Sequence, residues 1–189
     1  MSERIPLSRP SIGSAEKDAV IKVLESGRLS VERKPVDLKA LLSRAREQSI
    51  ASSPEISVKL SLPDEPKQVI VNGDQQRLLQ VIGNLLGNAV RHATGTQRLE
   101  MSLRAQEKEG KRYARIEVRD HGPGIAPEVM EALFTRFTKD TRAAQASRSG
   151  LGLGLFISRG IVEQHGGTIR ATSKPGEGAT FIVELPIAD

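Results

Sequence analysis

The longest regular pattern of apolar residues lies between Gly73 and Thr94, and it predicts a buried helix. Asp74 is a favourable N-cap residue, and the apolar residues behind it recur at the spacing of one helix face: Leu78, Leu79, Ile82, Leu85, Leu86, Ala89 and Val90. The opposite side carries Gln80, Asn84, Asn88 and Arg91, with His92 at its margin. Asparagine lowers helix propensity, so two of them one turn apart indicate amides that face a ligand. The alternative is an ordinary solvent-facing side.

Shorter helices and strands alternate along the rest of the chain. An N-cap at Asp37 predicts a helix to about Ser52, a short helix is expected near 127–133, and a further helix runs from Leu151 to His165 and ends at Gly166. Alternating polarity predicts strands at 57–62, 68–72, 98–106, 112–119, 168–172 and 179–185. We expect the first two strands to pair with each other and the others to form two hairpins. The predicted fold is an α+β two-layer sandwich, a mixed and mostly antiparallel sheet covered on one face by three helices.

Residues 1–30 differ in character from residues 31–189. They predict an extended stretch, IPLSRPSIG, and a short amphipathic helix over 15–25. The stretch resembles the N-terminus of sugar aminotransferases that use pyridoxal phosphate, but nothing after Ser30 continues that resemblance. We therefore expect an appended or fused segment at 1–30, or a degraded dimerisation helix, and a separate domain at 31–189.

Composition narrows the class of protein. The 189 residues are 38% hydrophobic and 27% charged, which is ordinary for a globular domain, and there is no cysteine for disulfide or thiolate chemistry. Neither a bilayer-spanning apolar run nor the apolar segment of a signal peptide is seen, so we expect a cytoplasmic domain without direct membrane contact. The net charge is +5, but the basic residues are scattered along the sequence, which argues against a nucleic-acid partner.

A loop that follows a predicted strand, DHGPGI from Asp120 to Ile125, is a first candidate site. Gly122 and Gly124 let the backbone approach a ligand closely. The Asp120 carboxylate only accepts hydrogen bonds, so it suits an exocyclic amine such as that of adenine. The alternative is an ordinary turn built from Asp and Gly.

A second loop, SGLGLGL from Ser149 to Leu155, leads into a predicted helix. Each glycine there costs up to about 1 kcal/mol relative to alanine, so three of them indicate a function. Amide groups at a helix start form a phosphate site. The GxGxG spacing matches neither the dinucleotide-binding GxGxxG nor the P-loop pattern, and the protein-kinase motifs are absent.

In order and spacing, NLLGNAVRHA, DHGPGI, FTRF and GLGLGL resemble the N, G1, F and G2 boxes of the catalytic ATP-binding domain of sensor histidine kinases. These kinases share a superfamily, and a Bergerat-type fold, with DNA gyrase, Hsp90 and MutL. The resemblance covers about residues 27–186. GRLSVERKPVDL is similar to the junction after the family's dimerisation hairpin, and GGTIRATSKPGEGATFIVELP is similar to its closing strands.

The resemblance implies roles for individual residues. Asn88 matches the ligand of the Mg²⁺ that bridges the ATP phosphates, Asn84 matches its companion near the metal, and Asp120 matches the carboxylate that reads the adenine amino group. The other implied nucleotide contacts are Arg91, His92, Gly122, Gly124, Ile125, Phe137, Gly150, Leu151, Gly152, Leu153, Gly154 and Thr180. Phe134 and Phe137 resemble hinge anchors of a lid over the triphosphate, with Arg136, Lys139, Arg142 and Arg148 as candidate phosphate contacts.

Two departures shape the expected activity. The hydrolytic relatives carry a general-base Glu at position 84, whereas Asn84 cannot take a proton, which favours phosphotransfer over hydrolysis. None of His92, His121 and His165 has the context of a phosphoacceptor, and we expect His165 to cap a helix. The acceptor histidine is therefore expected outside this chain.

The resemblance thus implies a Mg-ATP-dependent kinase domain that transfers the γ-phosphoryl group to a histidine. The acceptor belongs to a dimerisation domain in cis in the parent or in trans, with a response regulator as an indirect partner and a parent kinase that can be membrane-anchored. Alternatives within the superfamily are an ATPase, a serine kinase that acts on anti-sigma-factor antagonists, and a nucleotide-gated binding module. Asn84 speaks against the ATPase, and the junction-like GRLSVERKPVDL favours the sensor kinase over the serine kinase.

Overall fold

The computed structural model describes residues 33–92, 98–135 and 153–188. The predictions for residues 1–30 lie outside these ranges. In chain order the elements are β1 (Lys34–Asp37), α2 (Leu38–Ser52), β2 (Ser57–Ser61), β3 (Ile70–Gly73), α3 (Gln75–His92), β4 (Arg98–Lys108), β5 (Lys111–Arg119), α4 (Pro127–Ala132), α5 (Gly154–Gln164), β6 (Thr168–Ser173) and β7 (Ala179–Pro186). None of the helices within the described ranges is long and apolar enough to cross a membrane.

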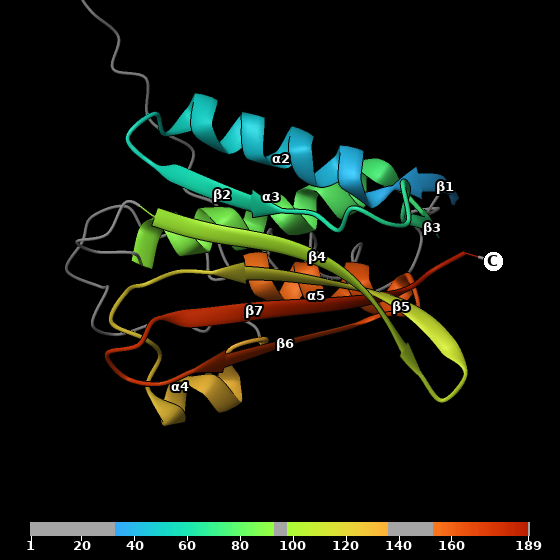
Figure 1. Ribbon diagram of the computed structural model, residues 1–189. Helices are drawn as coiled ribbons and strands as arrows, with labels where there is room; N and C mark the ends of the chain where they lie inside the picture. The colour runs from blue at the N-terminus through green and yellow to red at the C-terminus, as the bar shows by residue number, and fades with distance from the viewer. Residues whose placement is uncertain (1–32, 93–97, 136–152, 189) are drawn as a thin grey trace, which may run out of the picture. The chain divides into compact units, whose positions relative to one another are not determined.

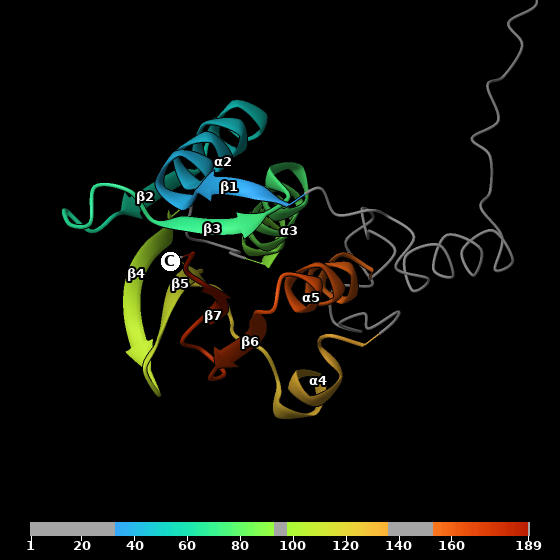
Figure 2. The ribbon, with the colours of Figure 1, turned by 90° about the vertical axis from the view of Figure 1, so that its right-hand side faces the viewer.

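The two layers are a five-stranded sheet and the helices on one of its faces. The strand order is β2-β4-β5-β7-β6, in which β2 pairs parallel with β4 and the other neighbours are antiparallel. Helices α2, α3 and α5 lie on the same face of this sheet (Figures 1 and 2). The buried core between the layers is aliphatic apart from Met101 and Phe181. The predicted α+β two-layer sandwich is therefore confirmed.

The predicted pairing of the strands at 57–62 and 68–72 is wrong. Strand β2 pairs with β4, with Val58 opposite Leu99, whereas β3 pairs with β1 in a separate two-stranded sheet. The connection between β2 and β3 contains Pro63 and Pro66, which lack the amide donors of a tight hairpin. Strand β1 was missed because its four residues, KPVD, contain a proline and show no usable alternation.

Side-chain caps fix the starts of α2 and α3, as predicted. Asp37 accepts a hydrogen bond from the amide of Lys39 at 3.0 Å. Asp74 accepts from the amides of Gln76 at 2.9 Å and Arg77 at 3.1 Å. The buried stripe of α3 consists of Leu78, Val81, Ile82, Leu85, Leu86 and Ala89. The predicted members Leu79 and Val90 pack against this core but are only partly buried.

Both predicted hairpins form, with strands slightly longer than expected. Strands β4 and β5 continue to Lys108 and Lys111, so their turn is reduced to Glu109 and Gly110. These two residues have φ angles of 52° and 72°, as a two-residue type I′ hairpin turn requires. Strands β6 and β7 are joined through the glycine-containing turn at residues 174–178.

Candidate functional site

Asn84 ties the middle of α3 to the start of α5. Its Nδ2 donates to the carbonyl oxygen of Gly154 and to Oγ of Ser158, both at 3.1 Å. Ser158 is fully buried, and its hydroxyl donates to the same Gly154 carbonyl at 2.8 Å. Because the nitrogen faces a carbonyl acceptor, the orientation of the Asn84 amide is fixed and only its Oδ1 is left for a ligand.

Asn88, one turn further along α3, is linked to Arg91. Its Oδ1 accepts a hydrogen bond from the Arg91 guanidinium group. Asn88 is partly buried and Arg91 is exposed, near the end of the helix, where a cation interacts favourably with the last carbonyls. The pair thus places a neutral acceptor and a positive charge next to each other.

Asp120 is the buried carboxylate of this region. Only 3% of the residue is exposed, and its Oδ1 accepts from the amides of Gly122 at 2.9 Å and Ala179 at 3.3 Å. The Asp120 amide in turn donates to the carbonyl of Ala179 at 2.9 Å. None of the bonds among the described residues uses Oδ2. The side chain is therefore held rigidly, with one oxygen available to a donor.

Close backbone crossings explain the glycines around Asp120. A Cβ atom at Gly122 would lie 2.3 Å from the carbonyl oxygen of His92, and one at Gly124 would lie 2.2 Å from that of Lys174. Gly178, which no sequence motif singled out, has a φ of +76°, and its Cβ would lie 2.1 Å from the Asp120 carbonyl oxygen. These glycines join the Asp120 loop to the end of α3 and to the β6–β7 turn, so their first role is the crossing of chain segments.

The loop after Asp120 is anchored on a serine hydroxyl. The Ile125 amide donates to Oγ of Ser173 at 2.8 Å, and that hydroxyl donates to the Gly178 carbonyl at 2.6 Å. Ile125 itself packs against the core. Ser173 therefore connects the predicted site loop to the turn that holds Asp120.

The described part of the glycine-rich loop is its end. Leu153 is buried and precedes α5, and Gly154 is the first residue of that helix. Phe134 packs against the core. The other predicted contacts of this region, Phe137, Gly150, Leu151, Gly152, Arg136, Lys139, Arg142 and Arg148, lie outside the described residues.

Thr180 does not lie beside Asp120 and the residues bonded to it, Gly122 and Ala179. It pairs with Arg119 across β5 and β7, whereas Asp120 follows Val118 on the opposite, helix-covered face. Neighbouring residues of a strand point to opposite faces, so Thr180 lies on the helix-free side of the sheet. The prediction of its contact with adenine is wrong for this geometry, because the pairing register could not be known from the sequence.

Sequence reasoning missed three residues that hold the site: Ser158, Ser173 and Ala179. Ser158 had a usable signal, since it is a polar residue on the buried side of α5 between Gly154 and Ile161. Ala179 contributes only its backbone, which no side-chain pattern can reveal.

The amide oxygens on α3 suit a metal ion such as Mg²⁺, which takes most of its ligands from phosphate and water. Among the described residues there is no group of three or more His, Cys, Asp or Glu side chains that can hold a metal. Mg²⁺ needs one or two protein oxygens when phosphate and water supply the rest. The amide oxygens of Asn84 and Asn88 are protein oxygens of this kind, and that of Asn88 also accepts from Arg91.

Comparison with known families identifies the arrangement. Residues 73–189 match the model of the histidine kinase-, DNA gyrase B- and HSP90-like ATPases. The chain belongs to this family. The ATPase domain implies ATP as its nucleotide. Its mixed sheet with helices on one face is the fold of histidine kinase ATP-binding domains.

Individual relatives are sensor kinases. The chain is 37% identical over 178 residues to the sensor-like histidine kinase SenX3 of Mycobacterium bovis, covering 89% of this chain and 41% of SenX3. It is 33% identical over 158 residues to the sensor protein SrrB of Staphylococcus aureus, covering 84% of this chain and 26% of SrrB. The chain thus spans less than half the length of these relatives, and it is homologous to their histidine kinase catalytic domain.

Solved structures of the family have the same fold. A solved chain of the mycobacterial sensor histidine kinase MprB superposes with a TM-score of 0.66 at 25% identity, over 82% of this chain and 97% of the solved chain. The ATP-binding domain of PrrB from Mycobacterium tuberculosis superposes with a TM-score of 0.61 at 26% identity, over 84% of this chain and 99% of that domain.

Proposed function

We propose that this domain binds Mg-ATP between α3, the Asp120 loop and the start of α5, and transfers the γ-phosphoryl group to a histidine of a separate dimerisation segment or chain. The observation that carries the proposal is the Asp120 carboxylate, buried and bound through one oxygen to two backbone amides. Its second oxygen is an acceptor for the amino group of adenine.

The proposed metal and phosphate contacts come from α3 and the loop before α5. Asn88 and Asn84 would hold Mg²⁺ through their Oδ1 atoms, and the metal would supply positive charge to the phosphates. Arg91 and His92, at the end of α3, would contact the phosphates and the adenine. The backbone amides of residues 150–154 complete the phosphate contacts.

The state of Asn84 supports transfer rather than hydrolysis. A water molecule needs a base to become a good nucleophile, and a side-chain amide does not accept a proton at neutral pH. The Nδ2 of Asn84 also donates to Gly154 and Ser158, so the side chain serves as a structural tie. Hydrolysis of bound ATP should therefore be slow, and the γ-phosphoryl group remains available for transfer to a histidine.

The chain's own histidines are poorly placed as acceptors. His165 is buried, and both of its ring nitrogens are hydrogen-bonded, to the Asp74 amide and the Ile161 carbonyl. His121 contacts Glu100 at 3.3 Å, and His92 ends α3. The proposal accordingly places the acceptor, the response regulator and any membrane anchor in other parts of the parent or in partners, and treats residues 1–30 as a segment appended to the domain at 31–189.

The site assignment is tested by substituting Asn88 and a matched amide on the same helix. Asn88→Ala should lower the affinity for Mg-ATP by at least about tenfold, because the metal loses a protein ligand. Gln80→Ala removes an exposed amide whose one hydrogen bond among the described residues comes from Arg77, so the affinity of this variant should equal that of the parent. Titration calorimetry measures both, with circular dichroism as the check of folding. Equal affinities in Asn88→Ala and the parent would refute the site.

The reaction is tested by intact mass and phosphate release after incubation with Mg-ATP. The chain alone should gain no phosphate and release little, whereas a dimerisation segment that contains the acceptor histidine should become phosphorylated when added in trans. Steady phosphate release without transfer would identify an ATPase. Phosphate on this chain itself would show an acceptor within it.

A further inference from the structure

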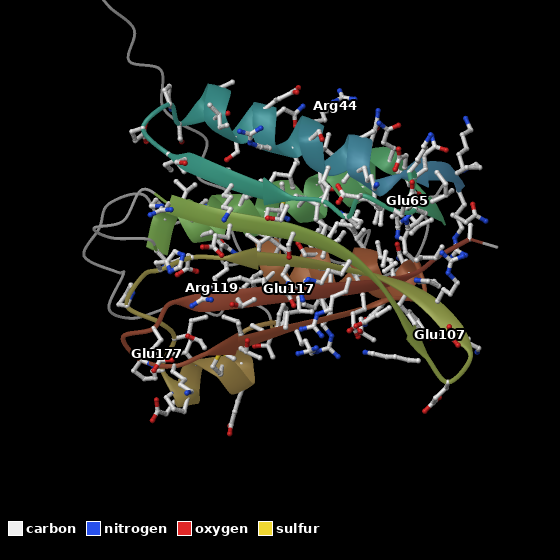
Figure 3. All side chains as sticks on the ribbon, in the orientation of Figure 1. Arg44, Glu65, Glu107, Glu117, Arg119 and Glu177 are labelled. Carbon is white, nitrogen blue, oxygen red and sulfur yellow. The ribbon has the colours of Figure 1, made fainter. Side chains whose placement is uncertain are left out.

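The helix-free face of the five-stranded sheet carries charges that the nucleotide site does not use. On β5, Ala114, Ile116 and Val118 are buried in the core, so the alternate residues Glu117 and Arg119 point to the other face. Both are labelled on β5 in Figure 3. Residues paired in register share a face, and the neighbouring strands therefore extend this set.

Three carboxylates lie on this face, and each one already has a partner. The contacts are Glu184 with Lys108 at 2.8 Å, Glu117 with Arg115 at 2.6 Å, and Glu100 with His121 at 3.3 Å. Glu184 also accepts from Gln106 at 2.7 Å. Each carboxylate on this face is therefore already in contact with a neighbouring basic side chain.

Cations outnumber these carboxylates by eight to three on the same face. Lys108, Arg115 and Arg170 approach Glu184. Within the described ranges the other five form no ion pair: Lys59, Arg98, Arg104, Lys111 and Arg119. Strand pairing therefore brings basic residues from β2, β4, β5 and β6, which are scattered in the sequence, onto one face.

A groove of about 420 Å³ opens among these residues. Lys59, Arg104 and Arg119 line it together with the hydroxyl-bearing Ser102 and Thr180. Arg104 lies directly opposite Arg115 in the β4–β5 ladder, and like charges in that position destabilise a sheet. Arg115 has Glu117 as a partner, and a bound anionic group would supply one for Arg104. We call this feature the basic groove.

We propose that the basic groove binds an acidic segment of a partner protein. Charge complementarity selects carboxylates as the ligand, and the hydroxyls offer further donors. Glu100 and Glu117 also line the groove, but they are already in contact with His121 and Arg115, whereas Lys59, Arg104 and Arg119 form no ion pair within the described ranges. None of the residues that line the groove is aromatic, so a nucleic-acid base has no side chain on which to stack. These features favour an acidic peptide over nucleic acid.

The groove and the nucleotide site lie on opposite faces of the sheet, so they can be tested separately. The test uses the full ¹⁵N-labelled chain with excess Mg-ATP present, titrated with a peptide of alternating Glu and Asp. Amide signals of β2, β4 and β5 around Lys59, Arg104 and Arg119 should shift, and the binding should weaken as salt is raised. Failure of ATP binding would not change this result, so the two proposals fail independently.

Charge-reversal variants locate the interaction. Arg119→Glu should weaken peptide binding about tenfold, whereas Arg44→Glu reverses an exposed charge on α2 and should change it less than about twofold. Both residues are labelled in Figure 3. The proposal is overturned by an absence of shifts, by shifts on the helices, or by equal losses in both variants. Tighter binding of single-stranded DNA than of the peptide would likewise overturn it.

Discussion

The backbone amide of Asp74 donates to Nε2 of His165 over 2.9 Å, and this bond joins the start of α3 to the end of α5. Nδ1 of the same ring bonds the Ile161 carbonyl at 2.7 Å, so it carries the proton and Nε2 is the acceptor. The predicted helix-capping role of His165 is confirmed, and the ring also secures a second helix.

We expect His165→Phe to lower the free energy of unfolding by about 2–4 kcal/mol. The ring volume is roughly kept, but the part-buried Asp74 amide loses its acceptor, and the buried Ile161 carbonyl loses the ring donor and keeps only the His165 backbone amide. Chemical denaturation measures the change. His121→Phe is the control, because the His121 side chain is 34% exposed, and it should cost less than about 1 kcal/mol. Equal losses in the two variants would show that the bonds of His165 contribute nothing specific.

Replacement of glycine by alanine should have opposite effects on stability at Gly178 and at Gly83. Gly178→Ala forces a Cβ to within 2.1 Å of the Asp120 carbonyl oxygen at a φ of +76°, and should destabilise the domain by at least about 3 kcal/mol. Gly83 lies exposed in the middle of α3, and an added methyl group there would meet nothing within 4 Å, so Gly83→Ala should stabilise the domain by about 0.5–1 kcal/mol. Thermal and denaturant unfolding of both variants checks the sign as well as the size.

Glu184 makes stability depend on acidity. Its pKa lies below the ordinary 4.5, first because Lys108 donates to the carboxylate and next through Gln106, although burial acts in the opposite direction. The unfolded chain therefore takes up the proton first as the pH falls. The contribution of Glu184 is complete above pH 4.5 and is lost as the pH drops through the lower pKa of the folded state.

Comparing unfolding free energies near neutrality and at about pH 3 tests this contribution. Glu184→Gln should lower stability near neutrality by roughly 1–2 kcal/mol and flatten the acid dependence. Glu107→Gln changes an exposed carboxylate of the β4–β5 hairpin and should leave the profile unchanged. An unaltered acid dependence in Glu184→Gln would contradict the assignment.

Asp120→Asn separates the structural oxygen from the one assigned to the nucleotide. The asparagine Oδ1 can keep the bonds from Gly122 and Ala179, while Nδ2 replaces the remaining oxygen by a donor. We expect an intact fold, at least about tenfold weaker ATP binding, and a reduced preference for ATP over GTP, since guanine presents an acceptor at that position. Competition binding of the two nucleotides measures it, and an unchanged preference would remove Asp120 from base recognition.

Local features were predictable from the sequence. The Asp74 cap and the two hairpins depend on residues close together in the chain, and both are confirmed. The buried stripe of α3 is confirmed except that Val81 was not predicted and Leu79 and Val90 are only partly buried. The Asp120 loop was also recognisable, because an Asp followed by two glycines at a strand end is a short-range pattern.

Features that depend on distant pairing were not predictable. The partner of β2 is 41 residues away in register, Ser57 opposite Arg98, and short-range alternation cannot report it. The register between β5 and β7 was equally unknown, so the prediction put Thr180 beside Asp120 although it lies on the other face of the sheet. The contact of Ser158 with Asn84 requires the packing of α5 on α3, and the basic groove requires the order of four strands.

The two bonds between α3 and α5 also have a mechanical consequence. Asn84 is hydrogen-bonded to Gly154 at the start of α5, and Asp74 is hydrogen-bonded to His165 at its end. Asn84 and Asp74 are ten residues apart, about 15 Å at 1.5 Å per residue of helix. With one such bond α5 could rotate relative to α3, whereas two bonds fix the orientation of the two helices relative to each other. A nucleotide bound at Gly154, as proposed, would therefore contact a helix that is also bonded to the junction of β3 and α3.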